Sequence, residues 1–209
     1  MRQRYLATIL ILLLLLIAGC GSVTSTEIPM GDVVTAIDPK DWEGTWLMYG
    51  PWNVGVLSFQ VRVTDADNGV LDVATVLYHS NAAPVFKSFR LYLRHRQSDY
   101  WLWSLKASDA SDDAAQPGYF WGLAARRLGS ERAVLWAPRE NAFADLVDQG
   151  ILQGEVSGTD VLLENFTEKQ WELMEAEDSV LTQHAHEPKL SLFYWEAPLV
   201  FIRAARDPW

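Results

Sequence analysis

Histidine is the side chain that most often does acid–base or metal chemistry at neutral pH, and this chain of 209 residues has four. His184 and His186 are followed by Glu187, and on an extended segment the two imidazoles would share a face that Zn²⁺ accepts. No third ligand is indicated elsewhere, and the segment has the composition of a solvated polar loop. His79 and His95 could each act as a general base, but neither accompanies a nucleophile motif such as Gly-x-Ser-x-Gly. We therefore expect no catalytic residue, no metal and no cofactor.

The N-terminus has the features of an export signal. Arg2 and Arg4 precede an apolar run over residues 9–18, about half of the ~20 residues that a membrane-spanning helix needs. Residues 16–20 (Leu-Ile-Ala-Gly-Cys) resemble the lipobox of bacterial lipoproteins, and Cys20 is the only cysteine of the chain. The resemblance implies cleavage before Cys20 and acylation of its thiol and new amino group. Two or more acyl chains give stable anchoring, so Cys20 is expected to be an anchor and not a catalyst.

The lipobox resemblance, the Ser, Thr, Gly and Pro that follow Cys20, and the strand pattern of the remainder divide the chain into three parts. Residues 1–19 would be the cleaved signal peptide, 20–40 the acylated cysteine with a flexible tether, and 41–209 a single β-rich globular domain. Gly21, and not Asp, follows the cysteine, which implies the periplasmic side of the outer membrane if the organism has two membranes. Loss of residues 1–19 moves the net charge from −10 to −12. An acidic chain is not expected to bind nucleic acid, whose phosphates need clustered Lys and Arg.

The body alternates apolar and polar residues with the period of a strand. Leu57, Phe59 and Val61 share one face, and an Asn-Gly turn within residues 65–69 leads to a returning strand over 70–78. Short connections throughout favour antiparallel pairing. Further strands are expected over residues 85–94, 100–106, 119–126, 132–136, 151–164 and 190–203.

Two short helices are expected among these strands. Phe143, Leu146 and Val147 have helical spacing, and Gly150 follows at a position typical of a helix end. Residues 167–170 (Thr-Glu-Lys-Gln) form a capping box, in which the first and last side chains satisfy each other's backbone N–H groups. Both helices are too short to be stable without packing on the sheet.

The start of the body carries the motif that bears on the fold. Residues 42–46 (Trp-Glu-Gly-Thr-Trp) resemble the Gly-x-Trp opening of lipocalins and other calycins. The resemblance implies a barrel in which Trp46 plugs one end and a late arginine, matched here by Arg203, lies across its indole. We therefore expect a mainly β fold, an antiparallel calycin-like barrel or sandwich of about eight strands with two short helices. An open α+β sheet is the remaining alternative.

Tryptophans on the central strands are the candidates for binding. Trp101, Trp103 and Trp121 lie on strands with two apolar faces, as expected where one face lines a ligand cavity or a protein interface. The alternative is that they fill a thick core.

Three functions are compatible with these features. The first is a lipid-anchored, non-catalytic structural or assembly module that docks another envelope protein. The alternative is a lipocalin-like carrier of a small apolar ligand. A hydrolase is third, because the sequence shows no constellation of acid, base and nucleophile. The expected partners are therefore the membrane, through Cys20, and either an envelope protein or an apolar ligand.

Overall fold

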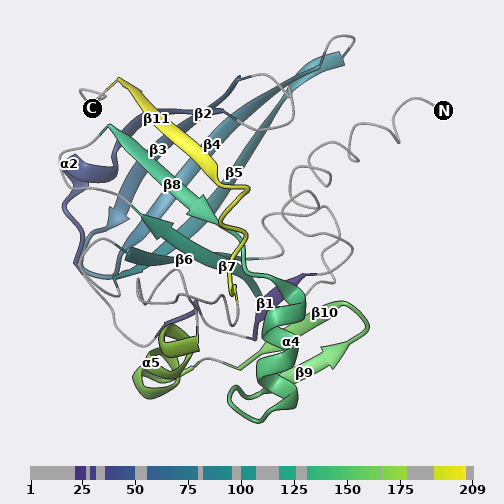
Figure 1. Ribbon diagram of the computed structural model, residues 1–209. Helices are drawn as coiled ribbons and strands as arrows, with labels where there is room; N and C mark the ends of the chain where they lie inside the picture. Colours follow the sequence, from purple (N-terminus) through teal and green to yellow (C-terminus); the bar gives the residue numbers. More distant parts are fainter. Residues whose placement is uncertain are drawn as a thin grey trace.

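The computed structural model describes residues 22–26, 29–31, 36–49, 56–79, 82–95, 100–106, 118–125, 131–164, 166–177 and 191–205, and strands predominate among them (Figure 1). In chain order the elements are β1 (Val23–Ser25), α2 (Pro39–Trp42), β2 (Gly44–Tyr49), β3 (Val56–Asp65), β4 (Val70–His79), β5 (Ala82–His95), β6 (Tyr100–Lys106), β7 (Tyr119–Ala125), β8 (Arg132–Trp136), α4 (Glu140–Asp148), β9 (Gly154–Ser157), β10 (Asp160–Leu163), α5 (Glu168–Glu177) and β11 (Leu199–Ala205).

Eight of the strands form a closed antiparallel barrel. Strands β2 to β8 follow one another around the wall, and β11 fills the gap between β8 and β2. Closure gives each strand of the wall a partner on both sides along part of its length, which removes most of the exposed strand edges. The structure confirms the expected mainly β, calycin-like barrel, and the sandwich and open sheet are excluded.

The β3–β4 hairpin forms as the alternating pattern predicts. Val61 pairs with Val73 and Phe59 with Thr75. In the turn, Asp65 accepts a hydrogen bond from the Asn68 backbone N–H at 3.1 Å, and Gly69 has a φ of +60°. The predicted strands over β6, β7 and β8 are also present, and β5 begins at Ala82, before the expected position.

The wall formed by β6 and β7 is apolar on both faces because both faces are covered. Inside the barrel is the interior core, whose buried members are Ile37, Trp42, Leu71, Leu93, Trp101, Trp103, Leu105 and Ala124. On the other face of β6 and β7 is the outer core, which α4 and α5 cover; it includes Leu102, Trp121, Leu123, Phe143, Leu146, Phe166, Trp171, Met174 and Phe193. Successive residues of β6 and of β7 therefore point into different cores.

Strand β7 is the point where the sheet leaves the barrel. One edge of β7 pairs with β6 along its length, whereas the other edge is shared. Residues 123–125 pair with β8, and Tyr119 and Phe120 pair with β1. Strand β1 runs parallel to β10, which pairs with β9, so the sheet continues outside the barrel as β1-β10-β9.

The expected tether over residues 20–40 is wrong for the described part of that segment. Val23, Thr24 and Ser25 are buried in β1, and Met30 is 0% exposed in the outer core. Ile37 packs in the interior core, just before α2. The physical reason is that β8 leaves half of one β7 edge unpaired, and β1 supplies the missing hydrogen bonds. These residues belong to the folded body.

Both expected helices are present. Helix α4 ends as predicted: Gly150 has a φ of +70° and donates to the Val147 carbonyl at 2.9 Å, while Ile151 donates to the Leu146 carbonyl at 2.9 Å. At α5, the Thr167 N–H donates to Gln170 Oε1 at 2.8 Å, and the Gln170 N–H donates to Thr167 Oγ1 at 3.4 Å, which confirms the capping box.

A third helix, α2, was not predicted. The Asp38 side chain caps it by accepting from the Lys40 N–H at 2.9 Å, and Pro39 occupies its first turn. Within the described residues, no helix is long and apolar enough to span a membrane.

Two late stretches differ from the expected strands. Residues 151–164 contain the separate hairpin β9–β10, which lies outside the barrel. The last strand begins only at Leu199. Residues 191–198 instead form a loop that bonds to the segment before α4, with the Arg139 N–H donating to the Leu192 carbonyl at 2.8 Å and the Tyr194 N–H to the Ala137 carbonyl at 3.0 Å.

Candidate functional site

Trp46 and Arg203 close one end of the barrel. They lie directly opposite each other in the register of β2 and β11, so their side chains share the interior face. The Arg203 guanidinium lies 4.7 Å from the Trp46 ring centroid, a cation–π arrangement. It also donates to the Lys40 carbonyl at 3.0 Å and to the Asp41 carbonyl, which fastens α2 across this end. The geometry is the Trp–Arg pair that the Gly-x-Trp motif implies.

The backbone conformation at Gly44 explains why the motif has a glycine there. Gly44 has a φ of +124°, which side-chain-bearing residues rarely adopt, and it lies where the chain turns from α2 into β2. This turn lets the Trp46 indole N–H donate back to the Trp42 carbonyl at 2.8 Å. The motif therefore holds α2, the turn and the plug together as one unit.

Apolar side chains continue along the inner wall of the barrel beside this plug. Phe59, on β3 directly opposite Trp46, and Phe201, on β11, lie on the two strands that flank β2, and their ring centroids are 5.6 Å apart. Several inward-facing apolar residues are only half-buried, namely Leu57, Phe59, Phe89, Phe120, Leu199 and Phe201. Thr75 and Lys87 add polar groups to the same face. An apolar inner wall of this kind could contact a nonpolar molecule along most of the molecule's length.

The three candidate tryptophans do not share a surface. Trp101 packs edge-on against Trp42 at 5.6 Å, and Trp103 lies against Gly122, both in the interior core. Trp121 faces the outer core. Its ring contacts Phe143 at 5.1 Å and Phe166 at 5.8 Å. Trp103 and Trp121 therefore do not line the same surface, because neighbouring strands place them on opposite faces of the wall.

The residues with potential acid–base or metal chemistry are not brought together in the described part of the chain. His79 and His95 lie at the ends of β4 and β5. His184, His186 and Glu187 lie outside the described residues, as does Cys20. Among the residues that are described, no group of three or more His, Cys, Asp or Glu side chains is placed to hold a metal ion.

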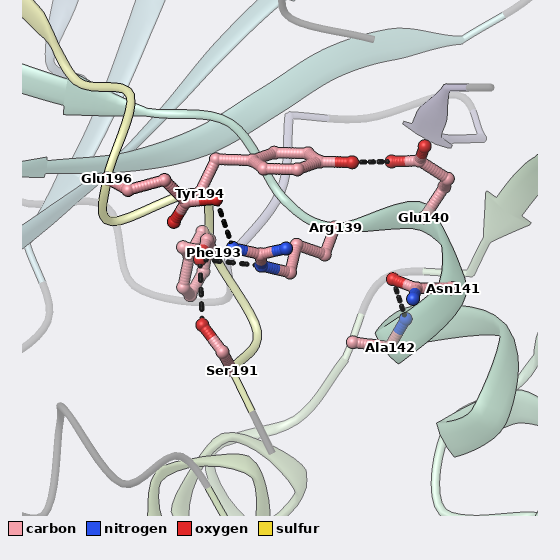
Figure 2. A network of polar contacts seen from close by, with 8 residues as sticks. All are labelled: Arg139, Glu140, Asn141, Ala142, Ser191, Phe193, Tyr194 and Glu196. Atoms are coloured by element: carbon pink, nitrogen blue, oxygen red, sulfur yellow. Dashed lines mark hydrogen bonds and ion pairs between the residues drawn. The ribbon is translucent and has the colours of Figure 1, made fainter. Parts of the chain in front are cut away.

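A polar network that the sequence did not reveal joins the start of α4 to the 191–197 loop (Figure 2). Arg139 forms an ion pair with Glu196, and its Nε donates to the Phe193 carbonyl at 3.2 Å. The same guanidinium lies 4.5 Å from the Tyr194 ring centroid. The Tyr194 hydroxyl donates to Glu140 at 2.7 Å. The partners are about 54 residues apart in sequence, so no local pattern could have brought them together.

The electrostatics of this network indicate that its role is structural. Burial and the hydrogen bond to Glu140 raise the pKa of Tyr194 to about 12, so the phenol stays protonated. A hydrogen bond from its own backbone, aided by Arg139, lowers the pKa of Glu196. Each charged group here is satisfied by another member of the network, and the arrangement holds α4 and the loop on the barrel.

A ribbon formed by β4 and β5 projects beyond the barrel (Figure 1). Strand β3 pairs with β4 only as far as Thr75, and β6 pairs with β5 only from Leu91 onward. Among the described residues, β4 residues 76–79 and β5 residues 82–86 therefore pair only with each other; we call this part the β4–β5 ribbon. Phe86 lies on it and is 78% exposed.

Phe86 was not among the predicted site residues, although the sequence carries a signal for it. In β5 the residues Phe89, Leu91 and Leu93 face the barrel interior, so Phe86 has the outward phase of Ser88 and Arg90. A large aromatic at an outward position is a signal for a contact surface; Tyr92, which shares this phase, packs edge-on against Tyr119, whereas Phe86 stays exposed.

Comparisons with protein-family models, with curated proteins and with solved structures found no match. The function is therefore inferred from the geometry of the chain itself.

Proposed function

We propose that this protein is a lipid-anchored envelope lipoprotein that docks another envelope protein through the β4–β5 ribbon. The observation that carries the proposal is Phe86, which is 78% exposed on a ribbon that extends from an otherwise closed barrel. A two-stranded ribbon without a third strand is marginally stable in water, so a partner that covers it would stabilise it.

The chemistry of the ribbon favours docking through side chains. Val76 lies directly opposite Phe86, so the two form an apolar pair on one face. Pro84 is exposed and lacks an N–H, which disfavours addition of a further strand along β5. Burying a Phe side chain contributes about 1.5–3 kcal/mol, enough for one anchor residue of an interface.

The anchor is the sequence feature at Cys20. The lipobox-like residues 16–20 would direct acylation, and Gly21 would allow transfer to the periplasmic side of the outer membrane in an organism with two membranes. A protein held on a membrane by acyl chains meets membrane-bound partners at a high effective concentration, so a small interface is sufficient. This favours a docking role for a ribbon of limited area.

We assign no catalytic role to the protein. The network of polar and charged side chains around Arg139 and Tyr194 holds α4 against the 191–197 loop.

The test is site-specific photocrosslinking in living cells. A photoreactive phenylalanine analogue replaces Phe86 in one variant and Leu173, exposed on α5, in the matched control. We expect a discrete crosslinked species of the same mass in repeated experiments at position 86 and none at 173. We also expect Phe86→Ser to leave thermal stability unchanged while removing co-purification of that species. Absence of a crosslink at 86 would contradict the proposal.

A second function, carriage of a small apolar ligand, is favoured by the half-buried inward-facing aromatics near Phe59 and Phe201. Native mass spectrometry of residues 21–209 from an envelope extract tests this function. A reproducible adduct of one molecule per chain, lost on unfolding, would support it, and a bare mass would exclude it for that extract.

A further inference from the structure

The N-terminal strand is fixed to the body from Ser22 onward. The Ser22 backbone N–H donates to Asp160 Oδ1 at 2.9 Å, and its hydroxyl donates to the same oxygen at 2.8 Å. The Val161 N–H donates to the Ser22 carbonyl at 2.8 Å. Val23 then pairs with Val161 in the parallel register of β1 and β10. The chain is therefore bound to β10 at its first described residue.

Only Gly21 separates this attachment from Cys20. Two residues of fully extended chain span about 7 Å, whatever conformation Gly21 adopts. An acyl chain on Cys20 would therefore hold Ser22 within about 7 Å, plus the reach of the cysteine side chain, of the membrane surface, and Asp160 one hydrogen bond further away. This distance leaves no room for a tether of the kind that would let the body turn freely.

We propose that the β9–β10 turn rests on the lipid headgroups and that the barrel stands on the membrane in one orientation. The proposal depends on the anchor at Cys20 proposed above. The turn consists of Ser157, Gly158, Thr159 and Asp160, all exposed, and these small polar groups suit contact with headgroups and not with hydrocarbon. The outer end of the β4–β5 ribbon is then far from this contact, because Figure 1 shows β9 and β10 in the lower part of the molecule and the end of that ribbon at the top.

The charges near the turn indicate which lipid surface fits. Glu155 and Asp160 are the charged residues of the β9–β10 hairpin, and Glu164 follows it directly. An acidic surface is repelled by anionic headgroups and can meet the ammonium group of a zwitterionic lipid. The acidic hairpin therefore fits a zwitterionic lipid surface better than an anionic one.

The experiment measures the distance of two positions from the membrane in the full-length acylated protein. The natural cysteine is consumed by acylation, so Thr159→Cys or Ser88→Cys supplies a single thiol for a bimane label. Ser88 is exposed on the outer face of β5 and is the matched control. The proteins are reconstituted in phosphatidylethanolamine–phosphatidylcholine vesicles that carry a nitroxide on a fraction of the headgroups.

We expect loss of most of the bimane fluorescence at position 159 and little loss at position 88. A Gly-Ser linker inserted between Gly21 and Ser22 keeps the lipobox and β1 but lengthens the connection, and it should remove most of the quenching at 159. Mass spectrometry of the same samples reports whether Cys20 is acylated.

The outcomes separate the two proposals. Acylated protein with equal quenching at both positions, or with quenching at 159 that the linker does not change, would overturn the orientation and leave the anchor standing. An unmodified Cys20 would overturn the anchor and the orientation together. Quenching confined to position 159 and lost with the linker supports both.

Discussion

Arg203, on the last strand of the barrel, lies over the ring of Trp46, on the first strand, with its guanidinium 4.7 Å from the ring centroid. The same guanidinium donates to the carbonyls of Lys40 and Asp41 and lies 3.4 Å from a carboxylate oxygen of Glu131. Its side chain is 1% exposed. One buried cation thus joins β2, β11, α2 and the segment before β8.

Replacement of Arg203 should destabilise the fold. Arg203→Ala would leave the Lys40 and Asp41 carbonyls without their donor, and we expect a loss of about 3 kcal/mol in the free energy of unfolding. Urea denaturation followed by tryptophan fluorescence measures the change. Arg90→Ala is the control, because Arg90 is exposed and forms its ion pair with Asp72 at 3.1 Å on the surface; it should change little. Equal stabilities of the two variants would contradict the role of Arg203.

Gly122 should not tolerate a side chain. A Cβ there would lie 2.2 Å from the Trp136 carbonyl oxygen and 2.8 Å from Trp103 Nε1, and the backbone atom cannot rotate away. We expect Gly122→Ala to lower the free energy of unfolding by about 3 kcal/mol or to prevent folding.

A matched control for this variant separates steric conflict from backbone strain. Gly158 has a φ of +63°, and a methyl group added there would meet no atom within 4 Å, so Gly158→Ala should cost only about 1 kcal/mol. Both variants are compared by the urea concentration at the midpoint of unfolding. A cost at Gly122 no greater than at Gly158 would mean that the wall can move apart there.

Thr167 should contribute through its hydroxyl alone. Thr167→Ala removes the cap of α5 and is expected to cost about 1 kcal/mol, measured by thermal and urea unfolding. Thr167→Ser keeps the hydroxyl and should be close to the natural protein. If Ser were as destabilising as Ala, the contribution would come from the methyl group and not from the cap.

Glu196 should make stability depend on pH in the acidic range. Its pKa is lowered below the ordinary value of 4.5 in the folded protein, so the folded state binds this proton less readily than the unfolded state. The stabilisation is therefore present above about pH 4.5 and is lost as the pH falls through the lowered folded-state pKa.

Unfolding of Glu196→Gln, followed in parallel with the natural protein from neutral pH downward, tests this dependence. The difference in free energy of unfolding should be greatest at neutral pH and should shrink on acidification. It should be modest throughout, because the Glu196 side chain is 61% exposed and solvent screens the pair. A difference that does not vary with pH would show that the carboxylate charge is not involved.

Local patterns predicted the elements of the wall, and some long-range features followed from the resemblance to calycins. Alternation at Phe59 and Val61 and the Asn68–Gly69 turn fixed a hairpin because period and turn chemistry act over a few residues. Arg203 and Trp46 lie on the last and first strands of the barrel, so no local pattern predicts that they pair. It was expected only because the Gly-x-Trp motif suggested a closed barrel.

Other features could not be predicted because they depend on what neighbouring strands leave uncovered. Val23–Ser25 has the composition of a linker and becomes a buried strand only because β7 has a free half-edge. Trp103 and Trp121 both lie on apolar strands, and only the three-dimensional wall decides that they face different cores. The Arg139–Tyr194 contact likewise needs a loop to fold back across the barrel.

The pairing of β11 with β2 also determines the order in which strand pairs can form during synthesis. A chain that emerges N-terminus first presents β1 and β2 early, but their partners β10 and β11 follow only after well over a hundred further residues. Contacts between such distant segments form slowly, because a long loop must close before they stabilise it. The barrel cannot close before β11 has arrived, and Ser22 cannot bond to Asp160 before β10 has. Until then the segment beside Cys20 remains accessible to the enzymes that would cleave and acylate it.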